Sequence, residues 1–600
     1  MKRHHLNKDL ICLILMLLSI IVIIVAYHDK YLYFSTTYFL ALYYLYKINT
    51  KKKPNLANVS SKDKIFALII SLLFIFSNYA MILTLANIDK LFNNIILYLC
   101  FISITTILPL YRFIIDILHY LIKGDFDFIN ARNAKKLSLK LLLIMLLISF
   151  GLYSLIYPGI LTSDSQWQLN QALNNEVLSN HHPIMMTLLI RLLINLGSQL
   201  GFNQLSIGMY FIFQIIIGNL IFAFVAYTLI KIKVSKKYLV FLFIVVVLNP
   251  VTYLYLCTMW KDIWLALFMM LFTILMIYYV KDNKYYNKGY FIIIFIIVCS
   301  SLSFSKNNAI YVIYLSFITC LVLLKNKRKE TLIIFIIPII IFKMITGIGY
   351  SNIGVIEGSK REMFSLPLQQ MVYINKYDHG INKDLKNSLN KYINLKKSLK
   401  NYKYYLSDPV KNTFKDDYYH NHSKEFIILY LKYLKESPLN ASKAFILQTF
   451  RYYTIHNNYW IVAHSSNFNK YKKFKKYDLK MEPLIRLSNK QDNMHIIKKW
   501  QILRKIPLVS DIYSVGIQIW MLMITCYIFI RKNRIIYLCI SLPIFYLYLT
   551  IIASPVNGEY RYAYPYILST LILLGFVLSK TFNEKEVDCN DRNCDSNTML

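Results

Sequence analysis

The chain has 600 residues, of which 56% are hydrophobic, and its mean hydropathy is +0.43. Soluble globular domains are less apolar and their apolar runs are shorter, so this composition excludes an ordinary soluble protein. The formal net charge of +37 invites a nucleic-acid partner. Because the Lys and Arg residues stand between apolar runs rather than in one basic patch, we expect no nucleic-acid partner.

Apolar runs long enough to cross a bilayer recur along the whole chain. A bilayer core about 30 Å thick needs roughly 20 apolar residues in a helix, and the sequence offers about fourteen such runs. In chain order they are residues 10–26, 31–46, 65–86, 95–111, 139–157, 206–230, 238–255, 263–280, 290–304, 310–324, 331–347, 512–530, 535–552 and 563–579. They predict an all-α polytopic membrane protein with about 14 transmembrane helices.

The Lys and Arg residues between these runs predict the orientation of the chain. Segments on the N-terminal side of the membrane carry 32 of them, whereas six short connections on the other side carry one each. Short loops rich in Lys and Arg stay in the cytoplasm, and long segments cross the membrane largely regardless of charge. We therefore expect a multi-pass protein of the cell membrane with both termini in the cytoplasm.

The spacing of the runs predicts four parts. Residues 1–347 form a transmembrane domain with one long external loop at 158–205, and residues 348–511 form an external, mostly α-helical soluble segment large enough to fold by itself. Residues 512–579 add the C-terminal transmembrane helices, and residues 580–600 form a cytoplasmic tail.

Distinctive polar residues gather at the external ends of the predicted spans. Ionisable residues in or near a membrane are costly and usually functional, and here carboxylates, imidazoles and cations recur on one face. They are Asp164 and Trp167, His181 and His182, Lys261 and Asp262, Lys306, Gln370, and Glu559, Arg561 and Tyr562. A catalytic site at the outer membrane surface accounts for this placement.

The order of these residues resembles the GT-C superfamily of membrane glycosyltransferases. The resemblance depends on a carboxylate in the first large external loop (Asp164), a His-Pro element in the same loop (His182 before Pro183), and an Arg-Tyr element that opens a late span (Arg561). In finer detail the chain resembles a poorly characterised bacterial family whose members share Trp-Lys-Asp and Pro-Leu-Gln-Gln elements. The loop has one carboxylate instead of an adjacent acidic pair, so the cofactor is unknown and a divalent cation is not indicated.

The resemblance implies transfer of a hexosyl or pentosyl group from a polyprenyl-phosphate-linked sugar to a cell-envelope glycan, lipid or protein acceptor, beside membrane lipids at the outer face. In this chemistry Asp164 is the general base for the acceptor hydroxyl, and cations stabilise the departing phosphate. The expected phosphate ligands are Arg561, Lys261 and Lys306. His181 and His182 bind sugar hydroxyls or phosphate, Trp167 stacks on a sugar ring, and Asp262, Gln370, Glu559 and Tyr562 complete the substrate-binding set.

Structural roles compete with each assignment. Asp164 is also placed to cap a short helix at 165–173, Lys261 to pair with Asp262, and Arg561 to pair only with Glu559. Trp260 is favoured as an interfacial belt residue. At the level of the whole protein, a transporter or flippase of lipid-linked precursors and a non-enzymatic envelope-assembly protein stay as alternatives, and the donor sugar, acceptor and oligomeric state are not predicted.

Overall fold

The computed structural model describes residues 2–26, 34–50, 59–89, 95–200, 206–281, 289–455, 485, 487, 493–505 and 509–584. Every regular element formed by these residues is a helix, and their β structure is limited to isolated bridges. The expected all-α architecture is therefore confirmed. The predicted tail beyond residue 584 and residues 456–484 of the predicted external segment lie outside the described residues.

Each range predicted as a span overlaps a helix or, for residues 238–255, a pair of helices bent by 51°. Among the described residues, six helices are long and apolar enough to cross a membrane, or seven if the bent pair is one span. The helices on the predicted ranges are α1 (Lys2–Ala26), α2 (Phe34–Thr50), α3 (Ser61–Asp89), α4 (Ile95–Lys123), α5 (Ala134–Leu155), α8 (Ser206–Lys231), α9 (Lys236–Leu242) with α10 (Pro250–Leu256), α11 (Lys261–Lys281), α12 (Gly289–Ser305), α13 (Ala309–Leu323), α14 (Arg328–Met344), α24 (Ile517–Arg531), α25 (Leu538–Ile552) and α26 (Tyr560–Val577).

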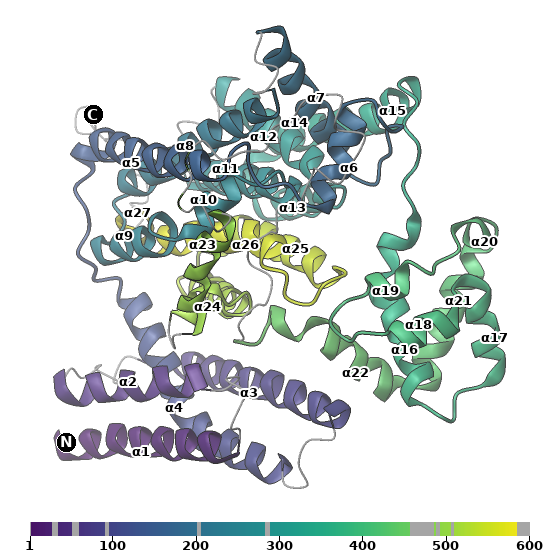
Figure 1. Ribbon diagram of the computed structural model, residues 1–600. Helices are drawn as coiled ribbons and strands as arrows, with labels where there is room; N and C mark the ends of the chain where they lie inside the picture. The colour runs from purple at the N-terminus through teal and green to yellow at the C-terminus, as the bar shows by residue number, and fades with distance from the viewer. Residues whose placement is uncertain are drawn as a thin grey trace.

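These helices form two groups along the molecule (Figure 1). Helices α1–α4 pack against one another at the bottom of the view, and α5 and α8–α14 form the larger group at the top. Helices α24–α26 return between the two groups, so the C-terminal part of the chain packs beside residues far earlier in sequence. The predicted boundary at residue 347 falls inside a helix, because the helical path of α14 continues to Asn352.

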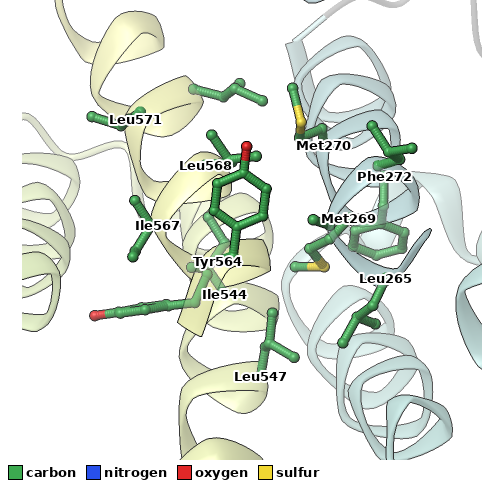
Figure 2. Packing of buried hydrophobic residues seen from close by; sticks show 14 of the residues in the cluster. Leu265, Met269, Met270, Phe272, Ile544, Leu547, Tyr564, Ile567, Leu568 and Leu571 are labelled. Carbon is green, nitrogen blue, oxygen red and sulfur yellow. The ribbon is translucent and has the colours of Figure 1, made fainter. Parts of the chain in front are cut away.

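Helix α11 lies at the centre of the larger group. Nearly all of its side chains are buried, which suits a helix that is apolar on every side. Figure 2 shows Met269 and Met270 on the side of α11 that faces α26, opposite Tyr564 and Leu568, with Leu547 of α25 below them. This packing fixes the starts of α11 and α26, which lie at the same end of the two helices and carry Lys261 and Arg561.

The predicted external loop at 158–205 contains two helices, α6 (Ser163–Ala172) and α7 (Ile184–Gln199). A separate helical unit follows α14 and a one-turn helix, α15 (Tyr350–Asn352). It contains α16 (Ser365–Tyr377), α17 (Lys383–Tyr392), α18 (Leu395–Asn401), α19 (Asp408–Lys411), α20 (Asp416–Asn421), α21 (Ser423–Glu436) and α22 (Pro438–Thr449). This unit has its own core, which includes Met371, Leu389 and Phe426.

The α16–α22 unit and the short terminal helix α27 (Lys580–Asn583) lie at opposite ends of the molecule (Figure 1). The start of α1 lies at the same end as α27, on the left of the view. Helix α6 lies toward the other end, where the α16–α22 unit is found. The first turn of α6 is therefore on the side of the molecule that the charge pattern assigns to the exterior.

Candidate active site

Helix α6 presents Asp164 from its first turn without using it as a cap. The N-cap is Thr162, and Ser165 completes a reciprocal capping box, in which the Ser165 Oγ accepts a hydrogen bond of 3.0 Å from the Thr162 amide. The capping role considered for Asp164 is therefore taken by Thr162, and the Asp164 carboxylate is left to interact with other elements.

The start of α6 is held against the segment that precedes α11. Ile160 and Thr258 form a parallel bridge, and the amide of Ile160 donates to the carbonyl of Cys257 at 2.8 Å. The Ser165 hydroxyl donates to the carbonyl of Met259 at 2.6 Å. These bonds place Asp164 beside the first turn of α11, although almost a hundred residues separate the two in sequence.

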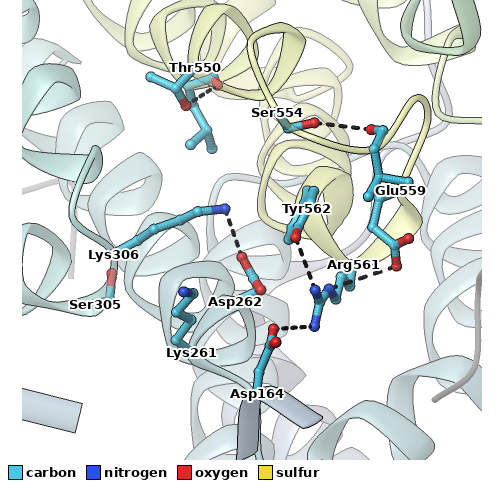
Figure 3. Close-up of polar contacts among 12 residues, drawn as sticks. Asp164, Lys261, Asp262, Ser305, Lys306, Thr550, Ser554, Glu559, Arg561 and Tyr562 are labelled. Atoms are coloured by element: carbon cyan, nitrogen blue, oxygen red, sulfur yellow. Dashed lines mark hydrogen bonds and ion pairs between the residues drawn. The ribbon is translucent and has the colours of Figure 1, made fainter. Parts of the chain in front are cut away.

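Arg561 joins this pair from α26. Its Nη1 lies 2.9 Å from Asp164 Oδ2, and its Nη2 donates to the Tyr562 hydroxyl at 2.9 Å (Figure 3). The guanidinium carbon lies 4.8 Å from the ring centre of Trp260 and 4.7 Å from that of Tyr562. Contact with two aromatic faces suits a planar guanidinium and restricts its movement.

The loop that carries Glu559 is fixed by the α16–α22 unit. The amide of Ser407 donates to the carbonyl of Pro555 at 2.8 Å, and the amide of Asn557 donates to the carbonyl of Tyr405 at 3.0 Å. Glu559 Oε1 then lies 3.8 Å from Arg561 Nε. The expected Glu559–Arg561 pair is present, but the shorter contact of Arg561 is with Asp164.

Lys306 and Asp262 form a second ion pair beside the first. Lys306 Nζ lies 2.9 Å from Asp262 Oδ1, and the same ammonium lies 4.4 Å from the ring centre of Tyr562 (Figure 3). Asp262 is almost fully buried, with 1% of its side chain exposed, and its Oδ2 has no hydrogen-bond partner among the described residues. The local Lys261–Asp262 pair considered from the sequence is replaced by this contact between α11 and the loop after α12.

Lys261 contacts a histidine. Its Nζ lies 3.0 Å from His182 Nδ1. Burial and the nearby charge of Lys261 lower the pKa of His182 well below its usual range. The shift favours the neutral ring, whose Nδ1 is then able to accept a hydrogen bond from Lys261 Nζ.

Asp164 lies beside the same positive charges, which favour its ionised form. Burial acts to raise the pKa of its carboxyl, but the positive charges of Arg561 and Lys261 outweigh burial and hold the pKa well below its ordinary value. The side chain is still 35% exposed. The site thus contains an ionised carboxylate that faces two cations and remains open on one side.

Glu559 is buried, with 8% of its side chain exposed. Burial raises its pKa to about 7, and the charge of Arg561 only partly offsets this effect. Asp164 and Glu559 therefore flank one guanidinium with their pKa values shifted in opposite directions, a pattern typical of sites that handle protons.

The raised pKa of Glu559 predicts a pH-dependent stability. The folded protein keeps the Glu559 proton up to about pH 7, whereas the unfolded chain loses it near the ordinary pKa of 4.5. The contribution of Glu559 to stability is therefore present below pH 4.5 and falls by about 1.4 kcal/mol per pH unit up to pH 7. In thermal unfolding of purified protein, Glu559→Gln should gain stability relative to the wild type as pH rises through this window. Parallel curves for the two proteins would contradict the shift.

Most of the predicted site residues meet in this cluster. Asp164, His182, Lys261, Asp262, Lys306, Glu559, Arg561 and Tyr562 belong to it. His181 lies at its edge, with its ring 4.7 Å from that of His182. Trp167 is on α6 with 56% of its surface exposed.

Gln370 is not brought to the cluster. It lies on α16, where its Nε2 donates to the carbonyl of Ala441 at 3.0 Å and its Oε1 accepts from the Tyr430 hydroxyl at 2.5 Å. Both partners belong to the α16–α22 unit. In the structure, the Gln370 amide connects helices of that unit.

Trp260 is a site residue that the sequence pattern did not predict. It is buried instead of lying in an interfacial belt, its indole Nε1 donates to Thr162 Oγ1 at 2.9 Å, and its ring covers Arg561. The signal was its position directly before Lys261. A Trp beside two charged residues at a span end suits a cation–π partner as well as a belt residue.

Comparisons with known proteins identify a family whose function is unknown. Residues 172–592 match the model of a family of unknown function, DUF6020. The match includes every cluster residue except those on α6 and its cap. Neither a curated protein nor a solved structure matches the chain significantly. Within the described part of the chain, no three His, Cys, Asp or Glu side chains gather in a way that holds a metal ion.

Proposed function

The chain belongs to the DUF6020 family of unknown function, and we propose that it is a membrane glycosyltransferase of the GT-C type. It transfers a sugar from a polyprenyl-phosphate donor to a cell-envelope acceptor at the outer face of the membrane. The observation that carries the proposal is the 2.9 Å contact between Asp164 and Arg561, two residues 397 positions apart in the chain. In the proposed reaction the first is the base and the second binds the leaving phosphate.

The Asp164 carboxylate is the proton acceptor in this reaction. The acceptor hydroxyl oxygen forms a bond to the anomeric carbon of the donor sugar, and its proton passes to the Asp164 carboxylate. The bond between the anomeric carbon and the phosphate oxygen breaks, and its electron pair stays on the phosphate. Attack opposite to the leaving phosphate inverts the configuration at the anomeric carbon.

The cations of the cluster suit the lipid phosphate. Arg561 presents a planar fork, which binds phosphate oxygens through two parallel hydrogen bonds, and Lys261 lies close enough to lower the pKa of Asp164. Lys306 reaches the same cluster through Tyr562, whose ring it contacts at 4.4 Å. Fixed positive groups around a leaving phosphate stabilise the charge that develops as the glycosidic bond breaks.

We place the reaction on the outer face and keep the fourteen-span topology as part of the proposal. Each predicted span falls on a helix, and the cluster lies away from α27 and the start of α1 (Figure 1). The excess of Lys and Arg assigns the end that contains α27 to the cytoplasm. In this arrangement both termini are cytoplasmic, the α16–α22 unit is outside, and a membrane-bound lipid phosphate reaches Arg561 from the outer leaflet.

A transfer assay tests the activity. Purified protein is reconstituted into vesicles that contain polyprenyl phosphates carrying radiolabelled hexoses or pentoses, together with envelope fractions as acceptors. Label is expected to leave the lipid and appear in an envelope acceptor. Movement of the intact labelled lipid across the vesicle membrane, with no label transferred from any donor, would favour a flippase and contradict the proposal.

A further inference from the structure

Arg561 is contacted on several sides in this structure. Its Nη1 donates to Asp164, its Nη2 donates to Tyr562, and its two faces contact aromatic rings. The remaining Nε hydrogen-bonds to none of the described residues, and the nearest carboxylate, Glu559, lies 3.8 Å away. Two of the five N–H hydrogens of Arg561 are thus used, and a phosphate that bonds to Nη1 from the side where Asp164 lies takes the place of that carboxylate.

Asp164 is the most exposed of the three carboxylates in the cluster. Asp262 has 1% of its side chain exposed and Glu559 has 8%, whereas Asp164 has 35%. A donor arriving from outside meets Asp164 first. Moving a buried carboxylate away from its cation carries a large desolvation cost, and moving a partly exposed one carries much less.

The other charges around Asp164 remain in place when a phosphate replaces the Asp164 carboxylate on Arg561. Asp164 faces Arg561 from α26, Lys261 from α11 and His182 from the loop before α7. Lys261 is bonded to neutral His182, and Lys306 is paired with Asp262. Loss of the Arg561 contact therefore leaves Asp164 with fewer partners, and its carboxylate accepts a proton more readily than it does beside the guanidinium.

We propose that the donor phosphate displaces Asp164 from Arg561, so that binding of the donor releases the carboxylate that accepts the proton. This inference depends on the proposed function and adds to it the order in which donor and acceptor bind. Before the donor binds, the Arg561 pair holds Asp164 in a poorly basic state, and an acceptor that arrives first finds its base engaged. After the donor binds, Arg561 neutralises the phosphate and Asp164 is free to take the acceptor proton.

The test measures binding of a short-chain isoprenyl methyl phosphate. This phosphodiester carries one negative charge, has no sugar to transfer and does not titrate near neutral pH. Its affinity is compared by calorimetry for wild type, Asp164→Asn, Arg561→Gln and the matched control Asp384→Asn, which changes an exposed carboxylate on α17. Infrared difference spectra of wild type and Asp164→Asn, with and without the phosphodiester, follow the Asp164 carboxylate directly.

Displacement predicts that Asp164→Asn binds the phosphodiester about tenfold more tightly, because a competing negative charge is removed. Arg561→Gln should bind more weakly and Asp384→Asn should match the wild type. The infrared spectrum of wild type should show a changed carboxylate band that Asp164→Asn lacks. If Asp164→Asn binds no more tightly and the band does not change, displacement is wrong while donor binding stands. If the wild type does not bind the phosphodiester, the proposed function is wrong as well.

Discussion

Replacing Asp164 with Asn is expected to lower the rate of sugar transfer by about 10²–10⁴-fold, the usual contribution of a positioned general base. The amide has nearly the size and shape of the carboxylate but does not accept the acceptor proton. Donor binding should persist, because Arg561 and Lys261 are unchanged. The effect should therefore appear in kcat and leave the KM for the donor equal or lower, as measured by transfer of label from the lipid donor in vesicles.

Two controls separate this loss from misfolding. The Thr162 capping box does not involve the Asp164 side chain, so the start of α6 should form normally in Asp164→Asn. The matched variant Asp384→Asn removes a carboxylate from the surface of α17 and should transfer sugar at the wild-type rate. Full activity of Asp164→Asn in well-folded protein would refute the assignment of the base and support a binding or assembly role.

Arg561→Lys is expected to lower kcat/KM for the donor by roughly 10²-fold, although the charge is conserved. A lysine has no planar fork, so it loses the pairing of two parallel hydrogen bonds to phosphate oxygens. It also loses the stacked contacts with Trp260 and Tyr562, at 4.8 and 4.7 Å. Rates measured over a range of donor concentrations should show a higher KM and a lower kcat together.

Arg328→Lys is the matched control for this substitution. Arg328 is exposed at the start of α14, and its Nε donates to the carbonyl of Leu321 at 3.4 Å. Exposed polar contacts of this kind contribute little, so the control should transfer sugar normally. Equal kinetics for Arg561→Lys and wild type would show that charge alone suffices at this position, and the bidentate phosphate contact would have to be abandoned.

The helices were predictable because their signal is local. A run such as 263–280 is apolar on every side, and the bilayer and the core both favour a helix there, so α11 lies where the sequence places it. The ends of helices depend on tertiary contacts. The helical path of α14 continues to Asn352, past the predicted boundary at residue 347. Hydropathy alone does not predict the residue at which a helix ends.

The sequence predicted most of the residues that lie together in the site. It did not predict which of them form pairs. Common sidedness placed Asp164, Lys261 and Arg561 together. The partners of Lys261 and Asp262 are His182 and Lys306, because adjacent residues on a helix point in different directions. Gln370 was predicted as a site residue, but its amide hydrogen-bonds inside the α16–α22 unit. The sequence alone does not distinguish a polar residue of the site from one that connects helices elsewhere.

Asp164 is synthesised long before Arg561, and this order has a consequence for assembly of the site. Asp164 enters the membrane region with α6, whereas Arg561 enters with α26, after helices α1–α25 have been made. A ribosome-bound intermediate that ends before α26 has its carboxylate and no guanidinium to pair with it. Insertion of α26 is thus the step that brings Arg561 to Asp164 and completes the cluster.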